Sequence, residues 1–153
     1  MEKQLRNILQ SSNIWQTIAK NKFNLLPSKS RGEIFTSSLY HEKSLRSFLR
    51  SGDNFSLTVE TDGFKVFKNG KLSIWPLFCS INEIEFFDKA RTTIMSSLWF
   101  SNSTKPPFET FLEPCITEAR RLYAVGFKWV DSFGVERCSR VTFLILVADA
   151  PVR

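Results

Sequence analysis

Two aspartates stand where predicted strands end, and of all the residues in this sequence they point most clearly to a reaction. Asp62 ends the alternating run 55–62, and Asp149 closely follows the apolar run 141–147. Ligands tend to gather at the carboxyl ends of strands in sheets with crossover helices. If these two strands are parallel neighbours, a spacing of about 4.8 Å puts both carboxylates within reach of one cation. Mg²⁺ and Mn²⁺ prefer oxygen ligands of this kind.

A pair of such ions about 3.5–4 Å apart can activate a water or a DNA 3′-hydroxyl and stabilise the leaving oxygen of a displacement at phosphorus. Two aspartates alone would hold that pair loosely, and a third acidic residue is the usual completion. The sequence stops at Arg153, four residues beyond Asp149. A structural interpretation competes with this one, because Asp62-Gly63 is a common hairpin-turn pair and Asp149 followed by Pro151 is typical of a strand exit.

The elements that must position these aspartates begin with a predicted meander of strands. Period-two alternation and β-branched or aromatic residues predict strands at 55–61, 64–67, 72–81 and 92–100, with a turn at Asn69-Gly70. Pro76 lies within the third of these runs. Because proline cannot donate a ladder hydrogen bond, it implies an edge position or a bulge there.

A helix and a hairpin follow the meander. Apolar residues at helical spacing predict a helix over 108–123, with Gly126 as its C-terminal cap. Pro114 would be costly inside that helix, so we expect a kink there or a helix that begins near Pro114. The remaining segment, 127–148, predicts a hairpin whose apolar second arm, 141–147, is buried on both faces.

The predicted order is strand, strand, strand, helix, strand, with the helix returning the chain beside its first strand. This order predicts an α/β (α+β) fold with a mixed sheet, the first half of a ribonuclease-H-like sheet; a different α+β arrangement stays open. Residues 1–52 predict a short, partly helical segment with a linker near 24–32. We therefore expect two units, 1–52 and 53–153.

The net charge of +6 is concentrated at the start of the sequence. Residues 1–50 hold nine Lys/Arg and three Glu, whereas the remainder holds twelve of each sign. A basic segment is typical of a phosphate-binding arm and predicts DNA as a partner, although a solvated tail has the same composition. No apolar run is long enough for a membrane span and no signal peptide is seen, so we expect an intracellular protein without membrane contact.

Cysteine and histidine give no metal pattern. Cys79, Cys115 and Cys138 are odd in number and widely spaced, which predicts reduced core residues instead of disulfides or zinc ligands. The single histidine, His41, has no partner at ligand spacing and is interpreted as a surface residue.

Short motifs spread over residues 53–153 resemble the catalytic region of CACTA-type DDE transposases and their animal relatives. In sequence order they are Thr61-Asp62-Gly63-Phe64, the Trp-Pro strand 72–77, Ile81-Asn82-Glu83-Ile84, Leu98-Trp99-Phe100, Phe111-Leu112-Glu113-Pro114 and Val147-Ala148-Asp149-Ala150-Pro151. Each is short, and their common order carries the resemblance. Residues 1–50 resemble nothing that we identify.

The resemblance implies a nuclear enzyme that cuts and joins DNA with Mg²⁺ or Mn²⁺, with Asp62 and Asp149 as catalytic residues and first two metal ligands. It also implies that Pro114 marks a helix start. Family members continue past the second aspartate to a third acidic residue, which predicts that this chain is a fragment or remnant and inactive alone. The alternatives are a small DNA-binding or protein-interaction module without catalysis, and a remnant without function.

Overall fold

The computed structural model describes residues 1–11, 14–23, 38, 42–68, 71–84, 92–102 and 105–148, and no side chain at 23 or 43–46. These residues form a mixed α/β arrangement, in which a helical segment is followed by two runs of strands with one helix between them. Their order is α1 (Glu2–Gln10), α2 (Ile14–Phe23), α4 (Lys43–Arg50), β1 (Phe55–Thr61), β2 (Phe64–Lys65), β3 (Leu72–Ile81), β4 (Ile94–Asn102), α6 (Phe108–Ala124), β5 (Phe127–Val130), β6 (Glu136–Ser139) and β7 (Val141–Ala148). Helices α1, α2 and α4 confirm that residues 1–52 are partly helical.

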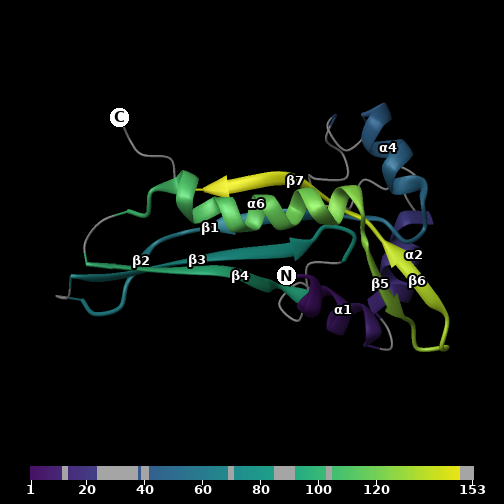
Figure 1. Cartoon of the computed structure of the whole chain (residues 1–153), viewed down its shortest axis with the longest axis horizontal. Coiled ribbons are helices and arrows are strands. Elements are labelled where there is room, and N and C mark those ends of the chain that lie inside the picture. Colours follow the sequence, from purple (N-terminus) through teal and green to yellow (C-terminus); the bar gives the residue numbers. More distant parts are fainter. Residues whose placement is uncertain are drawn as a thin grey trace.

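The main sheet contains both parallel and antiparallel pairs. Strand β3 pairs antiparallel with β4 on one side and with β1 and β2 on the other, while β1 pairs in parallel with β7. The predicted meander and the return of the chain beside its first strand are therefore confirmed. Figure 1 shows α6 lying along the sheet, with α1, α2, α4 and the β5–β6 hairpin gathered at one end.

The buried face of the sheet follows from the period-two pattern. Leu57 and Val59 of β1 are buried and lie opposite Ile81 and Cys79 of β3 in the antiparallel register. Helix α6 covers this face through edge-to-face aromatic pairs. Trp75 meets Phe108 with ring centroids 6.4 Å apart, and Trp99 of β4 meets Phe111 at 6.5 Å.

Helix α6 begins at Phe108 and continues through Pro114. The expectation of a helix start near Pro114 is therefore wrong. Pro114 is exposed on the helix surface, so the backbone acceptor that loses its partner one turn earlier can be satisfied by water. Gly126 does end the helix as predicted, because its φ of +75° is one that side-chain-bearing residues rarely adopt, and its N–H donates to the Leu122 carbonyl.

The N-terminal helices share the hydrophobic core of the sheet. Leu5 and Leu9 of α1 and Ile18 of α2 are buried in the same cluster as Phe55 and Leu57. Glu2 of α1 also forms an ion pair with Arg121 of α6 at 2.6 Å. The division of the chain near residue 52 stays a prediction, and the proposed linker 24–32 lies outside the described residues.

The β5–β6 hairpin packs against α2 at one end of the main sheet. Trp129 of β5 lies edge-to-face against Trp15 of α2, with ring centroids 5.6 Å apart, and donates its indole N–H to Ser139 Oγ at 2.9 Å. The predicted hairpin over 127–148 is only partly right, because its second arm is β6, whereas 141–147 belongs to β7 of the main sheet. The hairpin turn begins at Asp131. The Asp131 carboxylate anchors it by accepting hydrogen bonds from the Phe133 and Val135 backbone N–H groups.

Two predictions about burial are wrong. Strand β7 pairs only with β1 among the described strands, and Leu146 and Val147 are each 53% exposed, so this arm is not buried on both faces. Hydrophobicity alone does not distinguish an edge strand from a central one. Cys79 and Cys115 are buried as expected, but Cys138 is exposed because it lies on the outer side of the two-stranded hairpin. His41 lies outside the described residues.

Candidate functional site

Asp62 and Gly63 separate β1 from β2, two strands that pair one after the other with β3. Thr61 pairs with Leu77 and Phe64 pairs with Ile74, so β1 and β2 keep the same register along β3. The chain therefore does not reverse at Asp62-Gly63, and the hairpin-turn interpretation of this pair is wrong. Asp62 occupies the register position opposite Pro76.

Pro76 accounts for the interruption. It sits inside β3 between β1 and β4, so the expected edge position is wrong, whereas the β3–β4 register does shift close to it, between Leu77 and Phe78. In an antiparallel ladder the N–H and C=O of one residue face the same neighbour. The Pro76 carbonyl accepts a hydrogen bond from Thr61 Oγ1 at 2.8 Å, so its nitrogen, which carries no hydrogen, also faces β1. The ladder loses one bond at this point, and the Asp62 backbone is released from regular pairing.

Gly63 is required by the ring beside it. A Cβ atom at this position would lie 2.3 Å from Cε2 and Cζ2 of Trp75, well inside van der Waals contact. The indole of Trp75 is itself buried and held against Phe108 of α6. Position 63 therefore needs glycine, because the Trp75 indole lies across the backbone and leaves no room for a side chain.

Strands β1 and β7 end side by side, each at the residue that precedes a predicted ligand in the sequence. Their parallel register ends at Thr61 and Ala148, which directly precede Asp62 and Asp149 in the sequence. Asp62 is exposed, and its carboxylate has no hydrogen bond or ion pair with another described residue. Asp149 lies outside the described residues. An exposed carboxylate without a partner suits a hard divalent cation, which takes oxygen ligands.

The described residues alone do not complete a metal site. Among them, no group of three or more His, Cys, Asp or Glu side chains is arranged to hold a metal ion. Glu60 is exposed two positions before Asp62 on β1. In the parallel register it pairs with Val147, which offers no oxygen ligand from its side chain.

A buried polar cluster at the opposite end of β1 was not expected from the sequence. The fully buried Glu83 carboxylate accepts hydrogen bonds from the Ser56 backbone N–H at 3.0 Å and from Ser56 Oγ at 2.8 Å. Asn82 Nδ2 donates to Ser56 Oγ at 3.0 Å, and Thr58 Oγ1 donates to Asn82 Oδ1 at 2.7 Å. Burial raises the pKa of Glu83 more than these hydrogen bonds lower it. We call these four residues the Glu83 cluster.

Helix α2 is tied to the Glu83 cluster. Asn21 Nδ2 donates to the Glu83 carbonyl at 3.0 Å, and the Lys22 ammonium donates to the backbone carbonyls of Ser51 and Asn54. Burial lowers the pKa of Lys22 to about 8, although attraction to Glu83 and Asp53 opposes this shift. The cluster is buried, and the Asn21 hydrogen bond links α2 to it. Only the family motif at Ile81–Ile84 had drawn attention to these residues.

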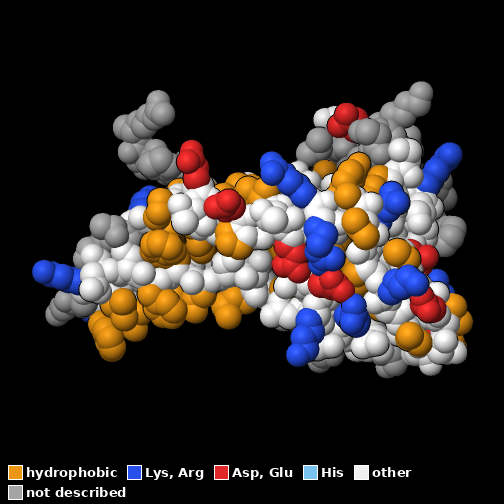
Figure 2. All heavy atoms as spheres, viewed as in Figure 1, with side chains coloured by type: hydrophobic (Ala, Val, Ile, Leu, Met, Phe, Trp, Pro, Cys, Tyr) orange, Lys and Arg blue, Asp and Glu red, His pale blue; other side chains and the backbone are white. Residues whose placement is uncertain are grey.

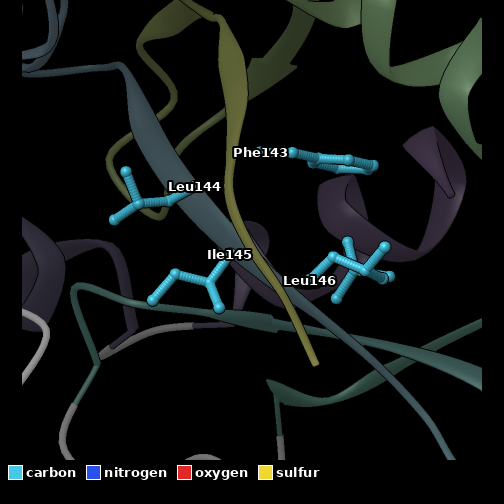
Figure 3. A pocket seen from close by; sticks show the side chains of 5 residues that line it. Phe143, Leu144, Ile145 and Leu146 are labelled. Atoms are coloured by element: carbon cyan, nitrogen blue, oxygen red, sulfur yellow. The ribbon is translucent and has the colours of Figure 1, made fainter. Parts of the chain in front are cut away.

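The exposed edge formed by β7 carries an apolar hollow. It is lined by Val59 of β1 together with Phe143, Leu144, Ile145 and Leu146. Figure 3 shows Leu144 and Ile145 on one side of β7 and Phe143 and Leu146 on the other. This departure from strict alternation reflects a bulge, because Phe143 pairs with Leu57 while Ile145 pairs with the next residue, Thr58. A hollow without polar side chains offers no ligand to a metal or a phosphate.

The basic residues of the N-terminal segment are partly engaged within the fold. Arg6 is paired with Glu2 at 2.6 Å, and Lys22 is occupied as described above. Lys3, Lys20 and Arg50 are exposed. DNA contact through this segment stays a prediction. No helix in the described part of the chain is long and apolar enough to cross a membrane.

No family model, no curated protein and no solved structure matches the chain.

Proposed function

We propose that this chain carries the first part of a ribonuclease-H-like core that cuts and joins DNA by metal-dependent phosphoryl transfer, as in DDE transposases. Asp62 and Asp149 are its proposed catalytic residues and first two metal ligands. One observation supports the proposal most strongly. The parallel pairing of β1 with β7 stops at Thr61 and Ala148, immediately before the two aspartates.

The strand arrangement supports the same conclusion. The order β4, β3, β1, β7, with α6 connecting the meander to the parallel strand, is the order expected for the first half of a ribonuclease-H-like sheet. Adjacent strands lie about 4.8 Å apart, so carboxylates that follow neighbouring strand ends can share a cation. The transposase resemblance adds the identity of the reaction but rests on the sequence motifs alone.

In this proposal Mg²⁺ or Mn²⁺ would supply activation of the attacking hydroxyl and stabilisation of the leaving oxygen. The chain's own contribution is positional. Thr61 Oγ1 is bonded to the Pro76 carbonyl, and Trp75 lies across Gly63, so the backbone on both sides of Asp62 is fixed by β3. The Asp62 carboxylate is thereby held at the surface instead of being drawn into the ladder.

Binding of Mn²⁺, followed by electron paramagnetic resonance, tests the metal site. Two carboxylates predict weak binding, on the order of millimolar, and Asp62→Asn or Asp149→Asn should each weaken it about tenfold. Glu60→Gln is the matched control, since it removes an exposed carboxylate of the same strand whose parallel partner is Val147. Equal Mn²⁺ affinity in all four proteins would overturn the proposed site.

Plasmid nicking tests the reaction. Two ligands hold a metal pair loosely, so little or no nicking is expected from residues 1–153 alone. Metal-dependent nicking that disappears in Asp62→Asn would show a competent site and correct the expectation of inactivity. Nicking that persists in Asp62→Asn and Asp149→Asn would refute the assignment of both residues.

A further inference from the structure

Two cysteines face each other where α6 packs on the main sheet. Cys79 of β3 and Cys115 of α6 are both buried in the hydrophobic core, and their thiols are hydrogen-bonded to each other. Cys138, the third cysteine, is exposed on the β5–β6 hairpin, outside the main sheet. The core therefore holds a dithiol that the candidate metal site does not use.

The spacing of residues along both elements explains why the two thiols meet. Trp75 of β3 contacts Phe108 of α6. Cys79 lies four residues further along β3, about 13 Å away, and Cys115 lies seven residues further along α6, about 10.5 Å away. The strand and the helix run in the same direction (Figure 1), so these steps bring the two cysteines together as a second contact between the same elements.

Hydrogen bonding within this dithiol makes its two sulfurs unequal. The hydrogen bond from Cys79 lowers the pKa of Cys115 to about 7, with a smaller contribution from Ser96 of β4, although burial opposes the shift. The same hydrogen bond, together with burial, raises the pKa of Cys79. The thiolate is the nucleophile in thiol oxidation, and a neighbouring thiol condenses with the oxidised sulfur. Cys115 is thus suited to attack and Cys79 to condense.

We propose that Cys79 and Cys115 form a reversible disulfide that links β3 to α6 when the protein meets hydrogen peroxide. The Cys115 thiolate attacks one peroxide oxygen, the O–O bond breaks and hydroxide leaves, which converts Cys115 to a sulfenic acid. The Cys79 sulfur then attacks the Cys115 sulfur, the S–O bond breaks and the S–S bond forms. The two hydroxides released take up the two thiol protons, so one peroxide oxidises two thiols to one disulfide and two waters are formed.

Burial limits which oxidants can reach the dithiol. Cys79 is 0% exposed and Cys115 is 2% exposed. One turn after Cys115, Glu118 joins Arg121 and Glu2 of α1 in a group of ion pairs. Figure 2 shows acidic and basic side chains together where α1 meets α6. A bulky reagent is therefore excluded, whereas hydrogen peroxide is close to water in size and enters when this contact opens locally.

The experiment counts free thiols after the folded protein has been treated with hydrogen peroxide. The full chain carries Cys138→Ser, which leaves only the two buried thiols. After peroxide is removed, the protein is unfolded in guanidinium chloride and titrated with a thiol reagent. The count should fall from two to zero per chain and return to two after reduction with dithiothreitol. Mass spectrometry of a digest should show the peptides of Cys79 and Cys115 linked, with two hydrogens lost.

Single substitutions in the same Cys138→Ser background distinguish the two sulfurs. With Cys79→Ser added, the sulfenic acid of Cys115 has no thiol to condense with, and dimedone should trap it. With Cys115→Ser added, the Cys79 thiol should stay reduced under the same conditions, because its partner no longer supplies the attacking thiolate. Circular dichroism confirms that each variant is folded.

Unfolding in urea supplies a second readout. The peroxide-treated Cys138→Ser protein should unfold at a higher urea concentration than the reduced protein, because the disulfide closes a loop in the unfolded chain. Dithiothreitol should remove this difference. The two single-thiol variants should show no such increase after peroxide treatment.

Three outcomes would overturn the proposal. Two free thiols per chain would remain after treatment of the folded protein, or Cys115 would become irreversibly oxidised while Cys79 stays reduced, or the disulfide would join two chains instead of two elements of one chain. The measurements use metal-free buffer and involve neither Asp62 nor Asp149, so the dithiol and the proposed function stand or fall separately.

Discussion

Replacing Gly63 by alanine tests the packing that holds the Asp62 segment in place. The new Cβ would lie 2.3 Å from two atoms of the Trp75 indole, so the ring must move. The ring is buried and contacts Phe108, and its displacement disturbs the packing between β3 and α6. Overpacking of this kind costs about 1–3 kcal/mol. For a chain of this length, that cost lowers the melting temperature by about 2–12 °C.

A double-mutant cycle isolates this contact. Trp75→Leu removes the ring atoms that crowd Gly63, and the backbone of Gly63 has no positive φ. In that background Gly63→Ala should stabilise the protein by about 0.4–1 kcal/mol, because alanine restricts the unfolded chain. The predicted coupling energy between positions 63 and 75 is therefore about 1.5–4 kcal/mol.

Urea unfolding followed by far-ultraviolet circular dichroism measures all four proteins of the cycle. Gly52→Ala is the control, because a Cβ at Gly52 would have no heavy atom within 4 Å. A coupling energy near zero, or a Gly63→Ala variant as stable as wild type, would refute the explanation of Gly63 by ring packing.

Three further outcomes are expected. Burial raises the pKa of Glu83, so above about pH 4.5 the folded state retains a proton that the unfolded state releases. The free energy of unfolding should therefore fall as the pH rises from about 4.5 through the raised pKa, and Glu83→Gln should abolish this slope. An unchanged slope in urea titrations of the variant across pH would contradict the explanation. Ser139→Ala leaves the buried indole N–H of Trp129 without its acceptor and should cost about 1–3 kcal/mol in urea unfolding; a neutral effect would show that this hydrogen bond is dispensable. In native protein, one thiol per chain, that of Cys138, should react with a thiol reagent, and all three should react in denaturant; rapid native reaction of all three would contradict the burial of Cys79 and Cys115.

Local patterns were enough to predict the sequence of elements. The period-two run at 55–61 is a strand, the apolar stripe from Phe108 is a helix that Gly126 ends, and the segment 141–147 returns beside the first strand. These features depend on spacing between residues close in the chain. The parallel pairing of β1 with β7, on which the candidate site depends, is also observed.

Features that depend on distant partners could not be predicted. Gly63 was interpreted as a turn residue, whereas its reason is the ring of Trp75, twelve positions later. Pro76 lies in a central strand because the neighbouring strand is interrupted beside it. Glu83 was expected only as part of a motif, and its burial with Ser56 arises from the antiparallel pairing of β1 with β3.

The extra residue at Leu144 in β7 also bears on how the protein behaves when it is concentrated. Among the described strands β7 lies at the edge of the sheet, and it has no charged residue between Val141 and Ala148, a combination that invites strand addition and fibre growth. The bulge breaks the regular spacing of backbone donors and acceptors halfway along the strand. An incoming strand then finds only two short paired stretches, so the irregularity opposes strand addition along an edge that carries no charge.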